Sequence, residues 1–230
     1  MNNIYRADLV AGMSADELNR EIAEPDRLVI ARTPSTKGVR EITTVWAPFD
    51  HVNRYARVAL VSLTPSRIQM RDALRSYRGS RVLGESHADA LERASVAGSY
   101  TGNMRRRLVA MLDEVGLHHY LDIASTSDLW SNASGKAHFT SCLRWPVFVG
   151  GKSYDGSSPG LLGRSDFRFM VEKILAREIA SLPPGCLVIP LGAAPNQVVR
   201  YLAQSDPGLD RGRILAGIPP RAATASRPGA

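Results

Sequence analysis

The stretch RVALVSLTPSRIQMRDALRSY, residues 57–77, decides the fold of this 230-residue chain. Its first seven residues form an apolar run with β-branched side chains, and the sequence Thr-Pro-Ser stops that run. We therefore predict a buried strand over residues 57–63. Apolar side chains then recur at helical spacing, which predicts a helix over residues 67–78.

The same alternation of strands and helices continues along the chain. Helical segments separate the predicted strands, which is typical of a parallel sheet covered by helices. We predict an α/β fold, a three-layer α/β/α sandwich with a central four-stranded parallel sheet. The other strands are predicted at residues 137–143, 186–191 and 213–218, and the other helices at 14–24, 86–97, 102–115, 165–182 and 195–204.

The remaining segments complete the predicted organisation. Residues 31–40 are predicted to be an exposed basic loop, and the Gly-, Ser- and Pro-rich residues 144–162 an irregular loop. Residues 1–45 are interpreted as an N-terminal extension packed on the core, and 46–218 as the main domain. The last segment, 219–230, is poor in large apolar side chains, so we expect a flexible C-terminal tail.

The charge balance indicates the partner class. The chain has 29 Lys and Arg residues against 22 Asp and Glu, a net charge of +7, and only four of the basic residues are lysine. Arginine suits phosphates and base edges, so nucleic acid is the leading partner. The alternative is a GC-rich genome, whose codons favour arginine over lysine.

Composition also limits cofactors and location. No window approaches 18 consecutive apolar residues and the start lacks a signal-peptide pattern, so we expect a cytoplasmic monomer without membrane contact. Two cysteines, Cys142 and Cys186, cannot form a disulfide scaffold, and we interpret them as buried thiols in adjacent strands. The five histidines show no metal spacing. We expect neither a metal nor an organic cofactor.

Ligands of open parallel sheets bind beyond the carboxyl ends of the strands. Here those strand exits fall at residues 62–66, 140–142, 190–192 and 218–221. The first exit runs into a predicted helix N-terminus, which favours anions such as phosphate. The alternative is that any turn from a strand into a helix has such a sequence.

Several segments resemble the uracil-DNA glycosylase superfamily. They lie in the same order as in that family and span roughly residues 46–218, which we therefore interpret as a glycosylase-like domain. The resemblance implies a protein that binds DNA, flips a nucleotide into a pocket at the strand ends and cleaves the N-glycosidic bond. The iron–sulfur branch of the family uses four cysteines, so no cluster is expected. The matching segments are WAPFDHVN (46–53), ARVALVSLTPSRIQM (56–70), GSYTGNMR (98–105), TSCLRWPVFV (140–149) and IPLG (189–192).

The first motif departs from the family pattern Gly-x-(Asp/Asn/Glu/Thr)-Pro-(Gly/Tyr). Here it reads Ser62-Leu63-Thr64-Pro65-Ser66, and Thr64 stands where the resemblance implies the water-activating residue. A hydroxyl orients water but is a poor base at neutral pH. The resemblance places all five residues in or beside the base pocket.

Two further positions are implied by the resemblance. Tyr100 matches the aromatic residue on which the flipped base stacks. Ser141 stands where uracil-specific members often have a base-reading asparagine, and serine is shorter and less selective. A smaller side chain there leaves room for a base larger than uracil, such as a hypermodified cytosine of phage DNA.

The last motif of the family normally contains His-Pro-Ser. This chain reads Gly217-Ile218-Pro219-Pro220-Arg221 and has no histidine there. Arg221 is then the nearby cation that would meet an anionic leaving base.

Further catalytic help is expected from Asp50 and Gln69, and less from Asp155. The predicted DNA contacts are Arg67, Arg105, Arg144, Lys152 and Arg221. For each of these, the alternative is an ordinary surface group.

Three functions remain open from the sequence. The first is an active glycosylase for a bulky modified pyrimidine, which would act in anti-phage defence or in repair. The second is a relative that has lost catalysis and only binds DNA. The third is a basic RNA-binding module, which tight binding to structured RNA but not to duplex DNA would favour.

Overall fold

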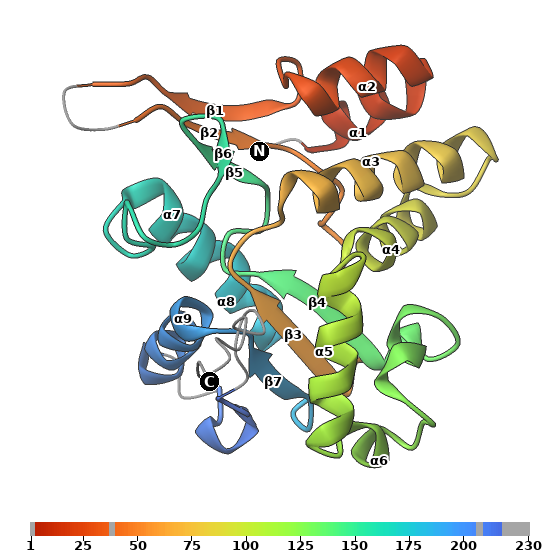
Figure 1. Ribbon diagram of the computed structural model, residues 1–230, viewed down its shortest axis with the longest axis vertical. Coiled ribbons are helices and arrows are strands. Elements are labelled where there is room, and N and C mark those ends of the chain that lie inside the picture. The colour runs from red at the N-terminus through yellow and green to blue at the C-terminus, as the bar shows by residue number, and fades with distance from the viewer. Residues whose placement is uncertain (1–2, 37–39, 206–208, 218–230) are drawn as a thin grey trace, which may run out of the picture.

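The computed structural model describes residues 3–36, 40–205 and 209–217. Helices and strands alternate along most of the chain, as predicted (Figure 1). The helices are α1 (Asn3–Gly12), α2 (Ala15–Ala23), α3 (Arg67–Val82), α4 (His87–Gly98), α5 (Asn103–Glu114), α6 (Leu117–Leu121), α7 (Ser165–Phe169), α8 (Ala176–Ala180) and α9 (Ala193–Ser205). The strands are β1 (Val29–Thr33), β2 (Ile42–Val45), β3 (Val58–Ser62), β4 (Ala137–Ser141), β5 (Val147–Val149), β6 (Lys152–Ser153) and β7 (Leu187–Pro190).

A parallel sheet of three strands, in the order β4-β3-β7, forms the centre of the protein. All three strands lie within runs predicted from the sequence. In the register of β3 and β4, Ser62 lies opposite Ser141. The carboxyl ends of these two strands therefore meet at one edge of the sheet.

The predicted fourth strand, residues 213–218, is not formed as a strand in the described part of the chain. Arg211–Arg213 is a 3₁₀ turn, because the carboxylate of Asp210 accepts a hydrogen bond from the Gly212 N–H at 2.8 Å. What remains is a single parallel bridge between Val188 and Ile214, beside β7. Residue 218 lies outside the described residues.

A second sheet was not predicted. It is antiparallel, with the order β1-β2-β5-β6. The prediction of a loop over residues 31–40 was therefore wrong for 31–33, and the loop 144–162 contains β5 and β6. These strands are short, and the side chains of β1 are only half-buried. Their sequences therefore lack the longer run of apolar or alternating residues by which a strand is predicted.

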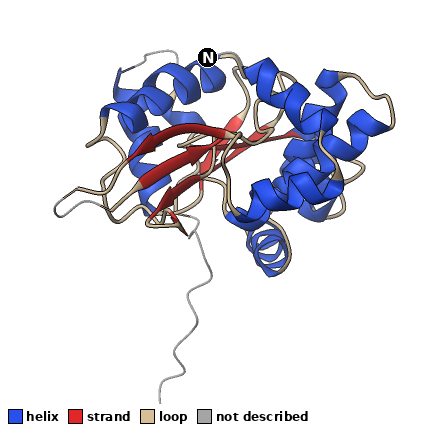
Figure 2. Ribbon diagram, turned by 90° about the horizontal axis from the view of Figure 1, so that it is seen from above, coloured by secondary structure: helices blue, strands red, loops and turns tan. Residues whose placement is uncertain are grey.

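Helices cover the parallel sheet from different sides. Leu60 of β3 shares an apolar cluster with Leu108 and Leu112 of α5, whereas Val188 of β7 packs in a cluster that includes Val171. Figure 1 shows α5 on one side of β3 and α8 and α9 on the other, and Figure 2 shows helices on both sides of the strands. No helix in the described ranges is long and apolar enough to span a membrane.

The predicted helices correspond to α2, α3, α4, α5, α9 and the run from α7 to α8, whereas α1 and α6 were not predicted. The capping box of Ser14 and Glu17 begins α2, as its spacing predicts. The long helix predicted for residues 165–182 is confirmed over residues 165–180, where α7, a π-helical segment (Met170–Leu175) and α8 follow one another without a break. α1, although amino-terminal, contributes buried residues to the same apolar cluster as α3.

Both cysteines are buried, as expected, but they do not lie in adjacent strands. Cys142 directly follows β4 and Cys186 directly precedes β7, and both of these strands flank β3. Burial raises the pKa of the Cys186 thiol to about 11.

Candidate active site

A small pocket opens where β3 and β4 end side by side. Its empty volume is about 300 Å³ when the open solvent at its mouth is included, but the centre of a water-sized sphere can reach only about 10 Å³ of it, so the pocket is narrow. Six of the predicted site residues come together here, from the ends of both strands, the first turn of α3 and the turn after α4. The lining residues are Phe49, Ser62, Pro65, Gln69, Ser99, Tyr100, Phe139, Thr140, Ser141 and Arg144.

A pair of serine hydroxyls forms one wall of this pocket. Because the two strands are in register, Ser62 Oγ and Ser141 Oγ lie 2.6 Å apart, and Ser62 Oγ is also 3.4 Å from the carbonyl oxygen of Thr140. Hydroxyl groups rotate and both donate and accept. This wall can therefore match either a donor or an acceptor on a ligand.

Aromatic rings form a second wall. Tyr100 is buried, its hydroxyl donates to the carbonyl oxygen of Leu60 at 3.5 Å, and its ring packs edge to face against Phe139 and Trp130 with centroids 6.2 Å apart. Burial raises the pKa of Tyr100, so its hydroxyl stays protonated. Such a wall offers apolar contact to a flat ligand.

Tyr100 adopts a left-handed backbone with φ of +50°, a conformation that costs free energy for a bulky residue. Arg105 holds this turn: its Nε donates to the Tyr100 carbonyl and another of its N–H groups to the Ser99 carbonyl, each at 3.0 Å. Its guanidinium also lies 5.2 Å from the Trp130 ring centroid. Arg105, predicted to bind DNA, thus braces the aromatic wall.

Gln69 offers a hydrogen-bond donor to the pocket. Its Oε1 accepts from the Ser66 N–H at 3.0 Å, and the Ser66 hydroxyl caps α3 in return. The cap therefore fixes which amide atom is the oxygen. Within the described part of the chain no residue accepts from Gln69 Nε2, so this nitrogen is left to donate to a ligand.

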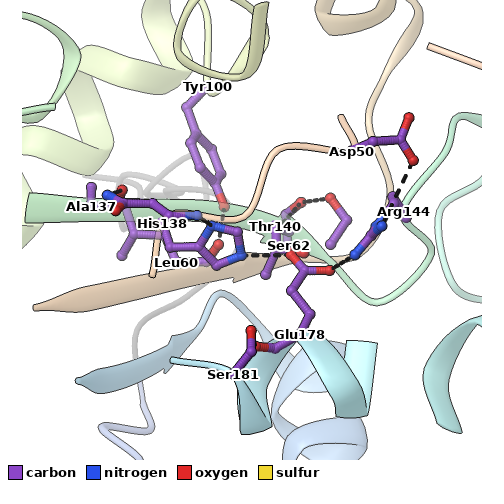
Figure 3. Close-up of polar contacts among 12 residues, drawn as sticks. Asp50, Leu60, Ser62, Tyr100, Ala137, His138, Thr140, Arg144, Glu178 and Ser181 are labelled. Atoms are coloured by element: carbon purple, nitrogen blue, oxygen red, sulfur yellow. Dashed lines mark hydrogen bonds and ion pairs between the residues drawn. The ribbon is translucent and has the colours of Figure 1, made fainter. Parts of the chain in front are cut away.

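A buried chain of charges leads into the pocket from below the sheet (Figure 3). Glu178 of α8 lies between His138 of β4 and Arg144, which follows β4. His138 Nε2 is 2.5 Å from one carboxylate oxygen of Glu178, and the Arg144 guanidinium donates to the other. Burial alone would raise the pKa of Glu178, but the hydrogen bonds and charges of His138 and Arg144 lower it to about 2.

Asp50 adds a second carboxylate to this chain. One of its oxygens is 3.7 Å from the Arg144 guanidinium, and the group accepts hydrogen bonds from Asn3 and Trp46 at 3.0 Å each. Burial raises the pKa of Asp50, and the charge of Arg144 opposes that shift. Asp50 contacts Arg144 but does not line the pocket itself.

The buried Nε of Arg144 has no hydrogen-bond partner among the described residues. The side chain as a whole is 15 % exposed. A buried donor without a partner costs free energy. A ligand acceptor in the pocket would remove that cost.

Thr64 does not line the pocket. Its hydroxyl donates to the Trp145 carbonyl at 3.1 Å and accepts from the Val147 N–H at 3.3 Å, so it joins the exit of β3 to β5. Leu63 is also outside the lining, and its carbonyl accepts from the Leu143 N–H at 3.0 Å. The water-activating role of Thr64 stays a prediction.

The side chains predicted to contact DNA differ in whether they already bind other parts of the protein. Arg67 donates to the carbonyls of Ile22, Ala23 and Gly151, and its guanidinium lies 4.3 Å from the Phe148 ring centroid, so it ties α2 to the second sheet. Lys152 is exposed on β6, with no hydrogen-bond or ion-pair partner among the described residues. Arg221 lies outside the described residues.

Sequence reasoning missed His138, Glu178 and the ring contributed by Phe49. Glu178 did carry a signal: it falls between Leu175 and Ile179 on the apolar side of a predicted helix, where an unpaired carboxylate would be costly. Its partners are at least 34 residues away in sequence, so the sequence alone did not reveal them. Among the described residues, no group of three or more potential metal ligands gathers.

The chain is similar to the "Uncharacterized protein YoxB" of Bacillus subtilis (strain 168). The two are 27 % identical over 163 residues, which cover 70 % of this chain and 64 % of that protein. The chain thus spans less than two thirds of the relative's length. No family model matches the chain, and no solved structure matches it.

Proposed function

We propose that this chain is a DNA glycosylase that flips a base into the pocket at the ends of β3 and β4 and hydrolyses its N-glycosidic bond. One observation carries the proposal: the hydrogen-bonded serines Ser62 and Ser141, the aromatic residues Tyr100 and Phe139, and Arg144 all line one pocket. Apolar contact and edge-reading polar groups are what an enzyme needs to hold an extruded base.

We propose a bulky modified pyrimidine as the target, such as a hypermodified cytosine of phage DNA, and a role in anti-phage defence. The small side chain of Ser141 supports a base larger than uracil. The rotating hydroxyls of Ser62 and Ser141 support a base edge other than that of uracil, because they do not require one fixed pattern of donors and acceptors.

The proposal includes a finer description of the fold, a three-layer α/β/α sandwich with four parallel strands. Ile214 supports it, since its bridge to Val188 occupies the position beside β7 that a fourth strand would take. The Leu215 N–H also donates to the Val188 carbonyl at 3.0 Å.

The reaction breaks the bond between the sugar C1′ and the base nitrogen. The electron pair leaves with the base, water adds to C1′, and the water's proton passes to solvent. In the proposal Thr64 and Gln69 orient the water or base, Asp50 acts through Arg144, and Arg221 and Lys152 hold DNA phosphates. The protein works as a cytoplasmic monomer without metal or organic cofactor.

A second function is favoured by a specific observation. The pocket lining contains no carboxylate and no histidine among the described residues, and both hydrogen bonds of the Thr64 hydroxyl go to backbone groups. A protein that captures a base without cleaving it needs no general base. The alternative is therefore a catalytically degenerate glycosylase that binds DNA.

The test is base release from duplexes that each carry one target base. The target bases are cytosine, uracil, 5-hydroxymethylcytosine, its glucosylated form and 5-formylcytosine. Alkali then cuts any abasic site. The proposal predicts cutting of modified duplexes only. Absence of cutting in every duplex, together with salt-sensitive DNA binding, would establish the binding protein instead.

A further inference from the structure

We propose that Arg144 is the catalytic cation that stabilises negative charge on the departing base, and that Glu178 is the positioning residue that aims it. This inference rests on the proposed glycosylase function. It differs from the sequence-based expectation, which gave this role to Arg221.

The first argument is placement. Arg144 lines the pocket, and its guanidinium is held from two sides by Glu178 and by Asp50. Glu178 is in turn fixed by His138, whose Nδ1 lies 3.4 Å from the Asn53 N–H and accepts from it. The other ring nitrogen, Nε2, lies 2.5 Å from the Glu178 carboxylate and donates a hydrogen bond to it. The arginine is therefore held rigidly before any ligand arrives.

The second argument is the unused donor of Arg144. Its Nε is buried and lacks an acceptor among the described residues, while one terminal nitrogen donates to Glu178 and the other lies 3.7 Å from Asp50 in an ion pair. The negative charge on a departing pyrimidine spreads from the ring nitrogen onto the neighbouring carbonyl oxygen. A hydrogen bond from the Arg144 guanidinium to that oxygen would gain strength as the bond breaks, which is the condition for lowering the barrier.

The third argument is that the other nearby arginines are already occupied. Arg67 donates to three backbone carbonyls and packs on Phe148. Arg105 donates to the carbonyls of Ser99 and Tyr100. Neither is among the residues that line the pocket, whereas Arg144 is.

The negative charge of Glu178 largely neutralises the positive charge of Arg144 beside the pocket. The pair is close to neutral, so Arg144 acts as a directed donor more than as a bare positive charge. A directed donor requires a fixed orientation, and Glu178 supplies it from the opposite side of the sheet from Tyr100 (Figure 3). Loss of Glu178 would leave the arginine in place but free to rotate.

The step balances without a co-reactant other than water. The C1′–N1 bond breaks, its electron pair goes to the base, and Arg144 donates a hydrogen bond to the base oxygen while keeping its own proton. Water then forms the new C1′–O bond and releases a proton to solvent.

The test compares two leaving groups under single-turnover conditions, 5-hydroxymethylcytosine and 5-formylcytosine in the same duplex. The formyl group withdraws electrons, so this base departs more easily and needs less help. We expect Arg144→Lys to lose about 100-fold or more in rate on 5-hydroxymethylcytosine and markedly less on 5-formylcytosine. Glu178→Gln should show the same pattern with a smaller loss.

Two further variants control for folding and charge. Arg107→Lys changes an exposed arginine on α5 and should leave both rates unchanged. The double variant Arg144→Met with Glu178→Gln removes the buried Arg144–Glu178 ion pair as a unit, so that Glu178 is not left as an unpaired charge, and it should lose rate as Arg144→Lys does.

The outcomes separate the inference from the function on which it rests. Equal losses on the two bases, or no loss at all, would overturn the role of Arg144 and leave the glycosylase proposal standing. Failure of the wild-type protein to release either base would overturn both the proposed function and this inference.

Discussion

Glu178 is fully buried, and burial by itself would raise the pKa of its carboxyl group. The hydrogen bonds and charges of His138 and Arg144 outweigh this effect and lower the pKa, so Glu178 is charged. Because its pKa in the folded state, about 2, is below the ordinary value of 4.5, Glu178 stabilises the fold above that ordinary value. The contribution is lost as the pH falls from about 4.5 to about 2. The pKa of Asp50 is shifted in the opposite direction, because burial raises it, so this group makes the opposite contribution to the pH dependence of stability.

We therefore expect Glu178→Gln to flatten the acid side of the stability profile. Wild-type protein should lose stability relative to the variant as the pH falls through that window, measured by urea unfolding at a series of pH values. The difference between the two proteins isolates Glu178 from other carboxylates such as Glu21, whose pKa is also lowered despite burial. If the stability of the two proteins changed in parallel with pH, Glu178 would not be charged in the folded protein.

Arg105, which we predicted to contact DNA, also holds the turn at Tyr100 beside the pocket. We expect Arg105→Gln to destabilise the protein by about 2 kcal/mol, because two charge-assisted hydrogen bonds to backbone carbonyls are lost. Base release should fall as well, since the turn at Tyr100 is no longer held. Urea unfolding and single-turnover assays measure the two effects.

Arg107→Gln is the matched control on the same helix, because Arg107 is exposed. Its stability should stay within about 0.5 kcal/mol of wild type. If Arg105→Gln weakened DNA binding without changing stability or base release, Arg105 would be a phosphate contact and not a brace.

At the scale of elements, the contact between α3 and α4 fixes the front of the pocket. Gly98 is the last residue of α4, and a Cβ there would lie 2.8 Å from Ala73 Cβ and 3.0 Å from Phe49 Cε1. Gly98→Ala should therefore cost about 1–3 kcal/mol and displace Phe49, with a lower rate of base release.

Gly79→Ala on α3 provides the contrast, because no atom lies within 4 Å of its Cβ position. Helix propensity alone then applies, and the variant should gain about 0.5–1 kcal/mol. Thermal unfolding compares both variants with wild type. A gain in stability for Gly98→Ala would mean that the two helices are less tightly packed than described.

The elements of the parallel sheet could be predicted because their sequence signals are local. β3 is a continuous apolar run stopped by Pro65, and α3 begins with the capping box of Ser66 and Gln69. The second sheet could not be predicted, because β5 is held by pairing with the distant strand β2 and by the Thr64 hydroxyl, and β6 is a two-residue strand that pairs with β5. The π-helical segment likewise has no local signal.

At the scale of the whole molecule, one topological rule predicted where the pocket would be. Parallel strands end at the same edge, so residues 62–66 and 140–142 were expected to meet, and Ser62 does contact Ser141. The charge chain through Glu178 could not be predicted in this way, because it joins α8 to β4 through the sheet. The position of the pocket was therefore predicted from the sequence, whereas the buried cluster of His138, Glu178, Arg144 and Asp50 was found only in the structure.

The most direct measurement is free-base release from glucosylated 5-hydroxymethylcytosine duplex by wild type and by Ser141→Leu, followed by mass spectrometry. Leucine at this position fills the pocket, while Ser131→Leu makes the same change at an exposed site. Thermal unfolding confirms that both variants are folded. We expect release by wild type and Ser131→Leu and none by Ser141→Leu, at unchanged DNA affinity. Equal release by all three proteins, or by none, would contradict the account.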